Sequence, residues 1–370
     1  MEKTELRSGY TTGACAAAGV KAAFLFHAGE DWREVSLTAL DGTPLMIPVK
    51  NVIHTVDGIC AEVVKFSGDD PDITNGVSVF TTVQMRDGVP GIEFRAGEGV
   101  GTVTKRGMSL PVGEPSINKG PRELIRQVVA EMTGQDNFGA VVTISIPAGT
   151  ELAKKTLNPV LGIEGGISVI GTTGVLRPMS EEAFKDSLVP QIDVALAAGE
   201  DCLVFVPGKI GERIALAWGI PKSAIIETSN FIGFMLDRSV ERKVKNILIL
   251  GHTGKLVKIA AGVFHTHNRM ADARLETLAA YGAAEGLGTE NVRAVLAANT
   301  TEDAMEIIAA SGLMESVCHV IAERVHIRAE RYLFGKVRVG AVMVNFAGDL
   351  LGIDDTAKSI AREHGWRLWE

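Results

Sequence analysis

The sequence predicts two domains of different fold class. Residues 1–155 are expected to form an α+β domain with mostly antiparallel strands, and residues 156–370 an α/β domain with a largely parallel sheet. A chain of 370 residues is long enough for both, since one domain takes roughly 100–200 residues. In the first part, short runs rich in β-branched residues alternate with Asp-Gly turn signals. From about residue 165, short apolar runs alternate with glycine loops and helical patterns.

The first domain opens with a predicted helix over residues 11–27. Thr11 or Thr12 can cap this helix, and its many alanines favour helical backbone. A later segment, residues 121–133, places its apolar side chains on one helical face. Strands are expected at residues 35–40, 45–49, 59–66, 77–85, 92–95 and 140–146.

The second domain is predicted to be Rossmann-like. Glycines follow three of its apolar runs, at Gly171, Gly208 and Gly251. In such folds, ligands bind at the carboxyl ends of the strands. The expected strands are residues 167–170, 202–206, 224–226, 246–250 and 337–346, and the expected helices include 181–198, 270–282, 301–310, 313–334 and a closing helix.

Composition excludes several classes of protein. The chain has 37 Lys and Arg against 45 Asp and Glu, a net charge of -8, which argues against a general nucleic-acid binder. No apolar run reaches about 18 residues, so no membrane span is expected. The four cysteines are far apart and form no CxxC pair, which fits reduced thiols in a cytoplasmic protein.

The first candidate motif is residues 7–18, RSGYTTGACAAA. It is a glycine and hydroxyl turn that leads into a helix whose free N–H groups suit an anion. Cys15 falls in the first helical turn, where a lowered pKa would make the thiol reactive. A small thiol in the core of an ordinary capped helix is the alternative that we favour.

Two further stretches of the first domain have polar chemistry. Residues 68–76, GDDPDITNG, carry carboxylates that can act as a base or bind a cation, although an Asp-Pro turn that caps backbone N–H groups is the favoured interpretation. Residues 97–102, GEGVGT, resemble a phosphate-binding loop without its Lys ending. Several Lys and Arg residues over 105–126 strengthen an anion-binding interpretation.

The second domain contributes two glycine loops, residues 171–174 (GTTG) and 251–255 (GHTGK). Glycines allow the backbone to approach a ligand, and hydroxyls can bind a carboxylate or a ribose. The loop 171–174 is not GxGxxG, so it does not specify a dinucleotide. His265 and His267 have no carboxylate partner that completes a metal-ligand set, so no protein-bound metal is expected.

Taken together and in order, these stretches closely resemble the cobalt-precorrin-5B C-1 methyltransferase family of the anaerobic route to cobalamin. One departure follows the second predicted strand of the C-terminal half, where Gly208-Lys209 replaces the Gly-Asn that is common in the family. The matching segments are residues 6–18 (LRSGYTTGACAAA), 68–76 (GDDPDITNG), 113–122 (GEPSINKGPR), 158–178 (NPVLGIEGGISVIGTTGVLRP), 229–234 (SNFIGF), 251–255 (GHTGK) and 266–274 (THNRMADAR).

The resemblance implies that S-adenosylmethionine is the cofactor and that its methyl group is transferred to C-1 of cobalt-precorrin-5B, giving cobalt-precorrin-6A. The partner is then a small-molecule tetrapyrrole, with no role for nucleic acid or membrane, and the cobalt belongs to the substrate. A homo-oligomer stays open. The alternatives are an ATP-dependent small-molecule kinase, based on Gly97–Thr102, and a non-catalytic tetrapyrrole-binding protein.

The resemblance also leads to a hypothesis for the site, in which the tetrapyrrole lies between the domains. Asp69 or Asp70 is the expected base. The expected cofactor-binding residues are Gly171, Thr172, Thr173, Gly174, Gly251, His252 and Thr253. The residues expected to bind the carboxylates of the tetrapyrrole are Arg7, Thr11, Thr12, Lys119, Arg122 and Arg177.

Overall fold

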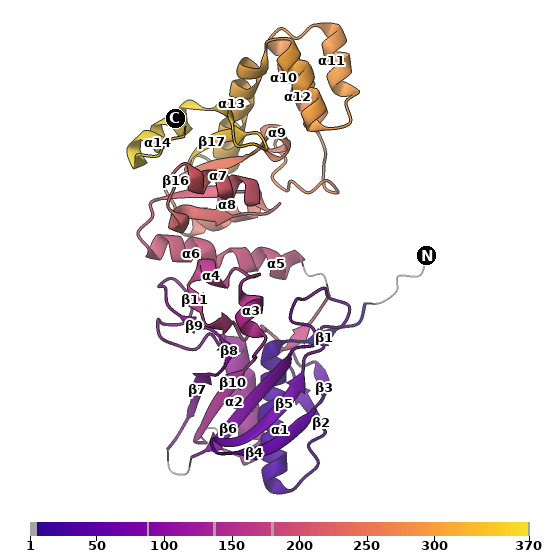
Figure 1. Cartoon of the computed structure of the whole chain (residues 1–370), viewed down its shortest axis with the longest axis vertical. Helices are drawn as coiled ribbons and strands as arrows, with labels where there is room; N and C mark the ends of the chain where they lie inside the picture. The colour runs from indigo at the N-terminus through magenta and orange to yellow at the C-terminus, as the bar shows by residue number, and fades with distance from the viewer. Residues whose placement is uncertain (1–5, 87–88, 136–137, 179–180, 369–370) are drawn as a thin grey trace. The chain divides into compact units, whose positions relative to one another are not determined.

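The computed structural model describes residues 6–86, 89–135, 138–178 and 181–368. The chain forms two compact units, Met1–Glu181 and Glu182–Glu370, and each unit has a five-stranded sheet (Figure 1). The first is the predicted α+β unit and the second the predicted α/β unit. In the described part of the chain, no helix combines the length and apolar character needed to cross a bilayer.

The main sheet of the N-terminal unit is antiparallel except at one edge, where β10 and β7 run parallel. Buried and partly exposed residues alternate along β5 and most of β6, because one face of the sheet meets the core. The strand order is β4 (Asn51–Thr55), β5 (Gly58–Val64), β6 (Ser78–Met85), β10 (Ala140–Ser145) and β7 (Ile92–Ala96), and β2 (Glu34–Thr38) and β3 (Pro44–Pro48) form a separate antiparallel pair.

Two helices, α1 (Thr12–Ala28) and α2 (Lys119–Thr133), pack against each other, and α1 also packs on β5 and β6 (Figure 1). Small side chains let α1 approach the sheet closely: a Cβ at Gly19 would lie 2.8 Å from the Cβ of Thr81. The sulfur of Cys15 is fully buried in this packing. Burial raises the pKa of the thiol to about 12, so the favoured interpretation of Cys15 as a core thiol is confirmed.

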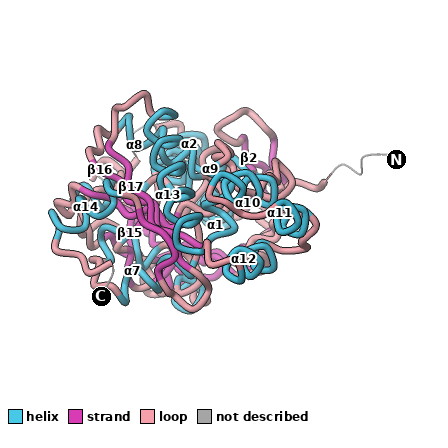
Figure 2. The backbone as a smooth tube through the Cα atoms, turned by 90° about the horizontal axis from the view of Figure 1, so that it is seen from above, coloured by secondary structure: helices cyan, strands magenta, loops and turns pink. Residues whose placement is uncertain are grey.

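The sheet of the C-terminal unit is parallel except for its last strand, which is antiparallel. Helices lie on both sides of it (Figure 2), and α7 (Lys209–Ala217) and α14 (Asp355–His364) share one core with the strands. The strand order is β15 (Ile225–Glu227), β14 (Cys202–Val206), β16 (Asn246–His252), β17 (Arg338–Val344) and β18 (Leu350–Ile353).

Further helices surround this sheet. The helices α9 (Thr253–Ala260) and α13 (Met314–Tyr332) contact each other, and both contact β17. The others are α5 (Glu181–Leu188), α6 (Pro190–Ala197), the 3-10 turn Lys222–Ala224, α8 (Ile232–Glu241), α10 (Arg274–Ala284), α11 (Thr289–Leu296) and α12 (Thr301–Ala310).

The structure differs from the prediction around residue 167, because residues 167–170 are not a strand of the parallel sheet. Residues 156–178 instead pair with the N-terminal unit, so the two units divide near residue 181 rather than at residue 155. The short strand pairs are β12 (Gly166–Ile167) with β8 (Gly99–Val100), β11 (Ile163–Glu164) with β9 (Thr102–Val103), and β13 (Val175–Leu176) with β1 (Gly9–Tyr10). Two short helices, α3 (Gly149–Ala153) and α4 (Asn158–Leu161), precede β11 in the sequence.

Three helix predictions also need correction. The helix expected over residues 181–198 is divided at Pro190, whose ring nitrogen has no N–H to continue the ladder. The helix expected from residue 270 begins only at Arg274. The prediction names no helix over Thr289–Leu296, where the structure has α11.

Candidate functional site

A cavity of about 440 Å³ lies at the carboxyl ends of β14 and β16 in the C-terminal unit. This is where a parallel sheet of this kind binds its ligands, and the volume is in the usual range for small-molecule sites. We call it the strand-end cavity. Its lining residues are Pro207, Gly208, Lys209, Ile210, Gly211, Asn230, Gly251, His252, Gly254, Lys255, Lys258, Thr266, His267, Asn268, Arg274 and Phe346.

Glycines bring the backbone of this unit close together beside the cavity. A Cβ at Gly251 would lie 2.6 Å from Cδ1 of Leu256 and 2.9 Å from Cγ of Pro207. A Cβ at Gly211 would lie 2.7 Å from the carbonyl oxygen of Leu250. Both distances are shorter than side chains tolerate, so these glycines permit the close approach of α7 and α9 to the strand ends.

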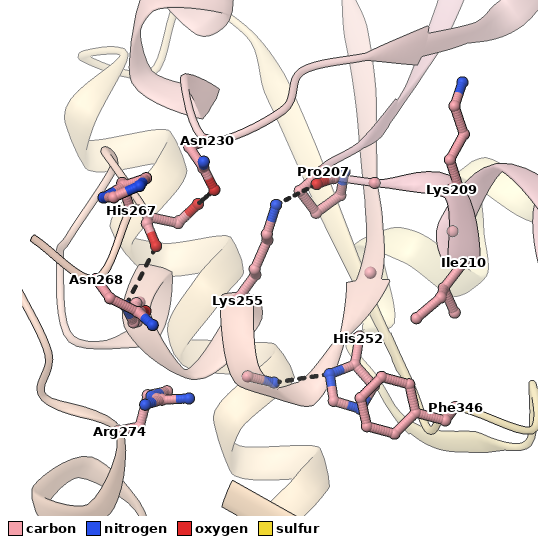
Figure 3. A pocket seen from close by; sticks show the side chains of 16 residues that line it. Pro207, Lys209, Ile210, Asn230, His252, Lys255, His267, Asn268, Arg274 and Phe346 are labelled. Atoms are coloured by element: carbon pink, nitrogen blue, oxygen red, sulfur yellow. Dashed lines mark hydrogen bonds between the residues drawn. The ribbon is translucent and has the colours of Figure 1, made fainter. Parts of the chain in front are cut away.

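His252 ends β16 and caps the helix that follows. Its Nδ1 accepts a hydrogen bond of 3.2 Å from the N–H of Gly254, which places the proton on Nε2. That Nε2 lies 3.3 Å from a carboxylate oxygen of Glu302, and the ring stacks on Phe346 with centroids 3.7 Å apart (Figure 3). Burial lowers the pKa of His252, an effect that Glu302 opposes. The neighbouring Thr253 is buried, and its hydroxyl donates to the carbonyl of Val344.

Two lysines of α9, Lys255 and Lys258, connect the loops that surround the cavity. The ammonium group of Lys255 donates to the backbone carbonyl of Pro207, in the loop after β14 (Figure 3). It also donates to the carbonyl of Ser229, in the loop after β15. Burial lowers the pKa of both lysines, Glu227 and Asp272 oppose this effect, and a neighbouring positive charge adds to it. Lys258 is only 1 % exposed. It donates to the Thr266 carbonyl at 3.2 Å, the Asn268 amide oxygen at 2.6 Å and the Ala271 carbonyl at 3.1 Å.

Arg274, the first residue of α10, reaches the cavity in a fixed orientation. Its Nε and Nη2 donate to the two carboxylate oxygens of Asp272 at 2.8 and 2.7 Å, and its Nη1 lies 3.3 Å from the hydroxyl of Thr301. The hydrogen bonds from Arg274 lower the pKa of Asp272 to about 2. The pair is therefore ionised over the whole physiological range.

In the N-terminal unit, the start of α1 packs on the loop 171–174. Thr11 caps α1, as predicted, by accepting from the N–H of Ala14 at 3.2 Å. The Thr12 hydroxyl lies within hydrogen-bonding distance of both backbone groups of Ile170. A Cβ at Gly171, whose φ is +144°, would lie 2.3 Å from the Thr11 hydroxyl oxygen. Both buried hydroxyls therefore have partners inside this unit.

The remainder of the loop 171–174 is tied down by backbone hydrogen bonds. The carbonyl of Gly174 accepts from the N–H of Thr11, and the carbonyl of Thr173 accepts from the N–H of Leu40. Thr172 is exposed. The expectation that the loops 171–174 and 251–253 follow strands of one sheet is therefore wrong, because only the second follows a strand of the parallel sheet.

Asp69 forms a two-point ion pair with Arg7. The guanidinium donates to Oδ1 at 3.0 and 2.7 Å, and the backbone N–H of Arg7 donates to Oδ2 at 2.7 Å. These hydrogen bonds hold the pKa of Asp69 below its usual value. A general base works best with a pKa near the operating pH, so this environment does not favour Asp69 as a base. The N–H of Asp70, in the same turn, donates to the Ser67 carbonyl at 3.2 Å.

The other predicted cationic residues differ in how they are held. Arg122 donates to the Ile117 carbonyl at 2.8 Å and to a Glu114 carboxylate oxygen at 2.9 Å, so its guanidinium has partners inside the unit. Arg177 is largely exposed and lies 3.1 Å from Asp41. Lys119, at the start of α2, is exposed.

The glycines over residues 97–101 serve close packing of the backbone. A Cβ at Gly97 would lie 2.0 Å from the Ser145 hydroxyl, and one at Gly99 would lie 1.9 Å from the Ile146 carbonyl. Gly99 also belongs to β8, which pairs with β12. These contacts account for the glycines by close packing of the backbone, without a bound phosphate.

Of the residues that the sequence proposes for cofactor binding, Gly251 and His252 line the strand-end cavity, and the basic residues beside them are not among the proposed ones. Lys255 and Arg274 lie within motifs that were recognised, yet neither was assigned to a site. Lys255 and Lys258 are three residues apart in an otherwise apolar helix that directly follows a strand, and this is the signal that would have found them. Among the described residues, no three His, Cys, Asp or Glu side chains are arranged to bind a metal, and the rings of His265 and His267 lie 6.5 Å apart.

Comparisons with known proteins place the chain in a family. Residues 1–178 match the family model CbiD, and residues 265–355 match the model of the CbiD C-terminal domain. A crystal structure of cobalamin biosynthesis protein (cbiD) from Archaeoglobus fulgidus is 27% identical, with a TM-score of 0.39, and the match covers 73% of this chain and 84% of that one.

Two curated relatives are similar over nearly their whole length. The cobalt-precorrin-5B C(1)-methyltransferase of Moorella thermoacetica is 47% identical over 364 residues, which is 98% of this chain and 99% of that protein. The protein of the same name from Methanocaldococcus jannaschii is 44% identical over 346 residues, 93% of this chain and 95% of that protein. The chain therefore belongs to the cobalt-precorrin-5B C(1)-methyltransferase family.

Proposed function

We propose that this chain transfers a methyl group to C-1 of cobalt-precorrin-5B in cobalamin biosynthesis. The observation that carries this proposal is identity of 47% and 44% to two methyltransferases of that name, over 98% and 93% of this chain. The substrate is then a corrinoid tetrapyrrole. We further propose that the methyl donor is S-adenosylmethionine, which supplies an electrophilic methyl group on a sulfonium.

The strand-end cavity is our proposed site for this donor. Three properties of the cavity support the proposal: its volume, its place at the carboxyl ends of parallel strands, and the bare backbone that Gly208 presents there. His252 and Phe346 offer a stacked ring pair, and the Asn230 amide offers a donor and an acceptor. Of the residues expected from the sequence, Gly251 and His252 line this cavity, whereas Thr253 supports it.

The protein contributes to such a reaction by binding both reactants and orienting them toward each other. Transfer of a methyl group to a carbon nucleophile needs both reactants in line, and positioning alone can supply a large share of the rate. Lys255 and Lys258 fix the loops that line the cavity, and His252 fixes the start of α9. These residues keep the cavity walls in one arrangement while the reaction proceeds.

We propose that exposed cations of the N-terminal unit meet carboxylates of the tetrapyrrole. Lys119 and Arg177 are exposed and suit this role best. Arg7, Arg122, Thr11 and Thr12 already have partners within the unit, so we infer that they shape the surface on which the substrate binds. The Arg7–Asp69 pair then holds Arg7 against the turn that contains Asp69, and Asp70 stays the candidate base.

Transfer of an isotopically labelled methyl group tests the proposal. The chain is incubated without oxygen with cobalt-precorrin-5B and S-adenosylmethionine labelled in its methyl group, and NMR of the product locates the label. We expect the label at C-1. A label at another ring carbon, or no transfer at all, would contradict the proposed function. Stabilisation by ATP that S-adenosylmethionine does not reproduce would instead favour the kinase alternative.

A further inference from the structure

The walls of the strand-end cavity carry an excess of positive charge. Lys209, Lys255, Lys258 and Arg274 line it, and none of the lining residues within the described part of the chain is Asp or Glu. A cation that is removed from water without a counter-charge is unfavourable. A ligand that carries negative charge would therefore complement these walls better than a neutral one.

The contacts of the four cations show where the excess lies. Lys209 lies 2.7 Å from a Glu227 carboxylate oxygen, and Arg274 is paired with Asp272. In the part of the chain that the structure describes, Lys255 and Lys258 form no ion pair, and their hydrogen bonds go to carbonyl and amide oxygens. Burial lowers the pKa of both ammonium groups, and the carboxylates of Glu227 and Asp272 oppose this effect without forming an ion pair with either lysine.

Donors remain for a ligand. Arg274 has five N–H bonds, of which three are directed at Asp272 and Thr301. Lys255 has three N–H bonds, and two of them meet carbonyls. Charged N–H donors of these two kinds make their strongest hydrogen bonds to carboxylates and phosphates.

Beside these donors there is room that a side chain would fill. A Cβ at Gly254 would have Nδ1 of His252, the Thr301 hydroxyl and Nη1 of Arg274 at 3.6, 3.7 and 3.9 Å. Those are ordinary van der Waals distances, so an alanine fits there. The missing side chain leaves three polar groups around one small space.

We propose that the strand-end cavity is a carboxylate-binding site in which Lys255 and Arg274 donate hydrogen bonds to a carboxylate of the ligand. The inference rests on the proposed function, because both reactants of that reaction carry this group. S-adenosylmethionine has a carboxylate at its amino-acid end, and the tetrapyrrole has several on its ring substituents. The experiment separates these two sources.

The test measures binding of two probes by isothermal titration calorimetry: S-adenosylhomocysteine, and uroporphyrin III as a stable polycarboxylate tetrapyrrole. The variants are Arg274→Gln and Lys255→Gln. The matched control is Arg338→Gln, since Arg338 also forms a two-point ion pair, with Glu363, and does not line the cavity. We expect both cavity variants to weaken one probe roughly tenfold or more relative to the control, as the loss of a charged hydrogen bond should.

The probe that is weakened identifies the source of the carboxylate. Loss of S-adenosylhomocysteine binding alone assigns it to the cofactor, and loss of uroporphyrin binding alone assigns it to the tetrapyrrole. If Arg274→Gln does not fold, Gly254→Ala takes its place, because the added methyl group fills the space without a clash.

Two outcomes would overturn the inference. If the cavity variants bind both probes as tightly as Arg338→Gln, the cavity does not recognise a carboxylate. The proposed function is then judged separately, by the labelled-methyl assay. If the wild-type protein binds neither probe and transfers no methyl group, the inference and the proposed function fail together.

Discussion

Lys258 is a buried ammonium group whose three hydrogen bonds all go to one loop. The acceptors are the carbonyls of Thr266 and Ala271 and the amide oxygen of Asn268, between α9 and α10. A methionine there would keep the hydrocarbon volume and leave the three acceptors without their donor. Lys258 is therefore best described as a positioning residue for the loop that brings His267, Asn268 and Arg274 to the cavity.

Lys258→Met should lower the free energy of unfolding by about 1–3 kcal/mol, because buried acceptors lose their partner. It should also raise the KM for S-adenosylmethionine more than it lowers kcat. The control is Lys21→Met, since Lys21 is buried in the N-terminal unit with Ser36 and Glu131 as acceptors. Lys21→Met should cost similar stability and leave the KM unchanged. A wild-type KM in Lys258→Met would contradict the positioning role.

The lowered pKa of His252 makes the free energy of unfolding fall as the pH falls. Its pKa is lowered from 6.5 by burial, so the folded state stays neutral where the unfolded chain takes up a proton. The stability that neutral His252 contributes is present above pH 6.5 and is lost as the pH falls below it toward the lowered folded-state pKa.

His252→Asn replaces the capping nitrogen by an amide oxygen that can also accept from Gly254, and it removes the titration. Its Tm should therefore fall less than that of the wild type on acidification below pH 6.5. The pKa of His364 shifts in the opposite direction. Burial lowers it, but hydrogen bonds to Ile360 and Asp201 outweigh burial and raise it. His364→Asn should lose stability at low pH. Parallel Tm profiles for the wild type and His252→Asn would contradict the account of the cap.

At the scale of helices and strands, the features that depend on residues close together in the sequence could be predicted. Thr11 was a predicted cap because hydroxyl residues cap helices, and α1 begins there. The classes of the two sheets followed from the spacing of apolar residues. Residues 167–170 were misplaced because strand pairing is non-local: the neighbouring β12 pairs with β8, which lies far away in sequence.

The site was predicted less completely than the fold. Gly251 and His252 follow a strand in the sequence, so their place at the cavity could be inferred. The environment of Arg274 could not, because its partner Thr301 lies on a different helix. The ion pair between Asp69 and Arg7 joins residues that are 62 positions apart in the sequence, so no local pattern predicts it.

The contact of the loop 171–174 with α1 gives a prediction for one glycine. Gly171→Ala should destabilise the protein by about 2–4 kcal/mol, through positive φ and a clash with Thr11. Gly288 is the control, because φ there is -62° and nothing lies within 4 Å of an added Cβ. Gly288→Ala should cost less than about 1 kcal/mol, as a change of one capping residue. Equal urea midpoints for the two variants would contradict this account of the loop.

At the scale of the whole molecule, charge is distributed unevenly. The chain carries a net charge of -8, yet the lining of the strand-end cavity is basic. A locally positive cavity in an acidic protein suits a small anionic ligand and not a nucleic acid, which needs an extended basic surface. The composition alone argued against a nucleic acid, whereas the basic lining of the cavity is seen only in the structure.

The central claim is that the strand-end cavity of the C-terminal unit binds the methyl donor of the reaction. Hydrogen exchange of the full chain, with and without S-adenosylhomocysteine, tests it most directly. We predict slower exchange in peptides that cover residues 207–211 and 251–258, which line the cavity. Slower exchange confined to residues 11–13 and 171–174 would contradict the claim and assign the cofactor to the N-terminal unit.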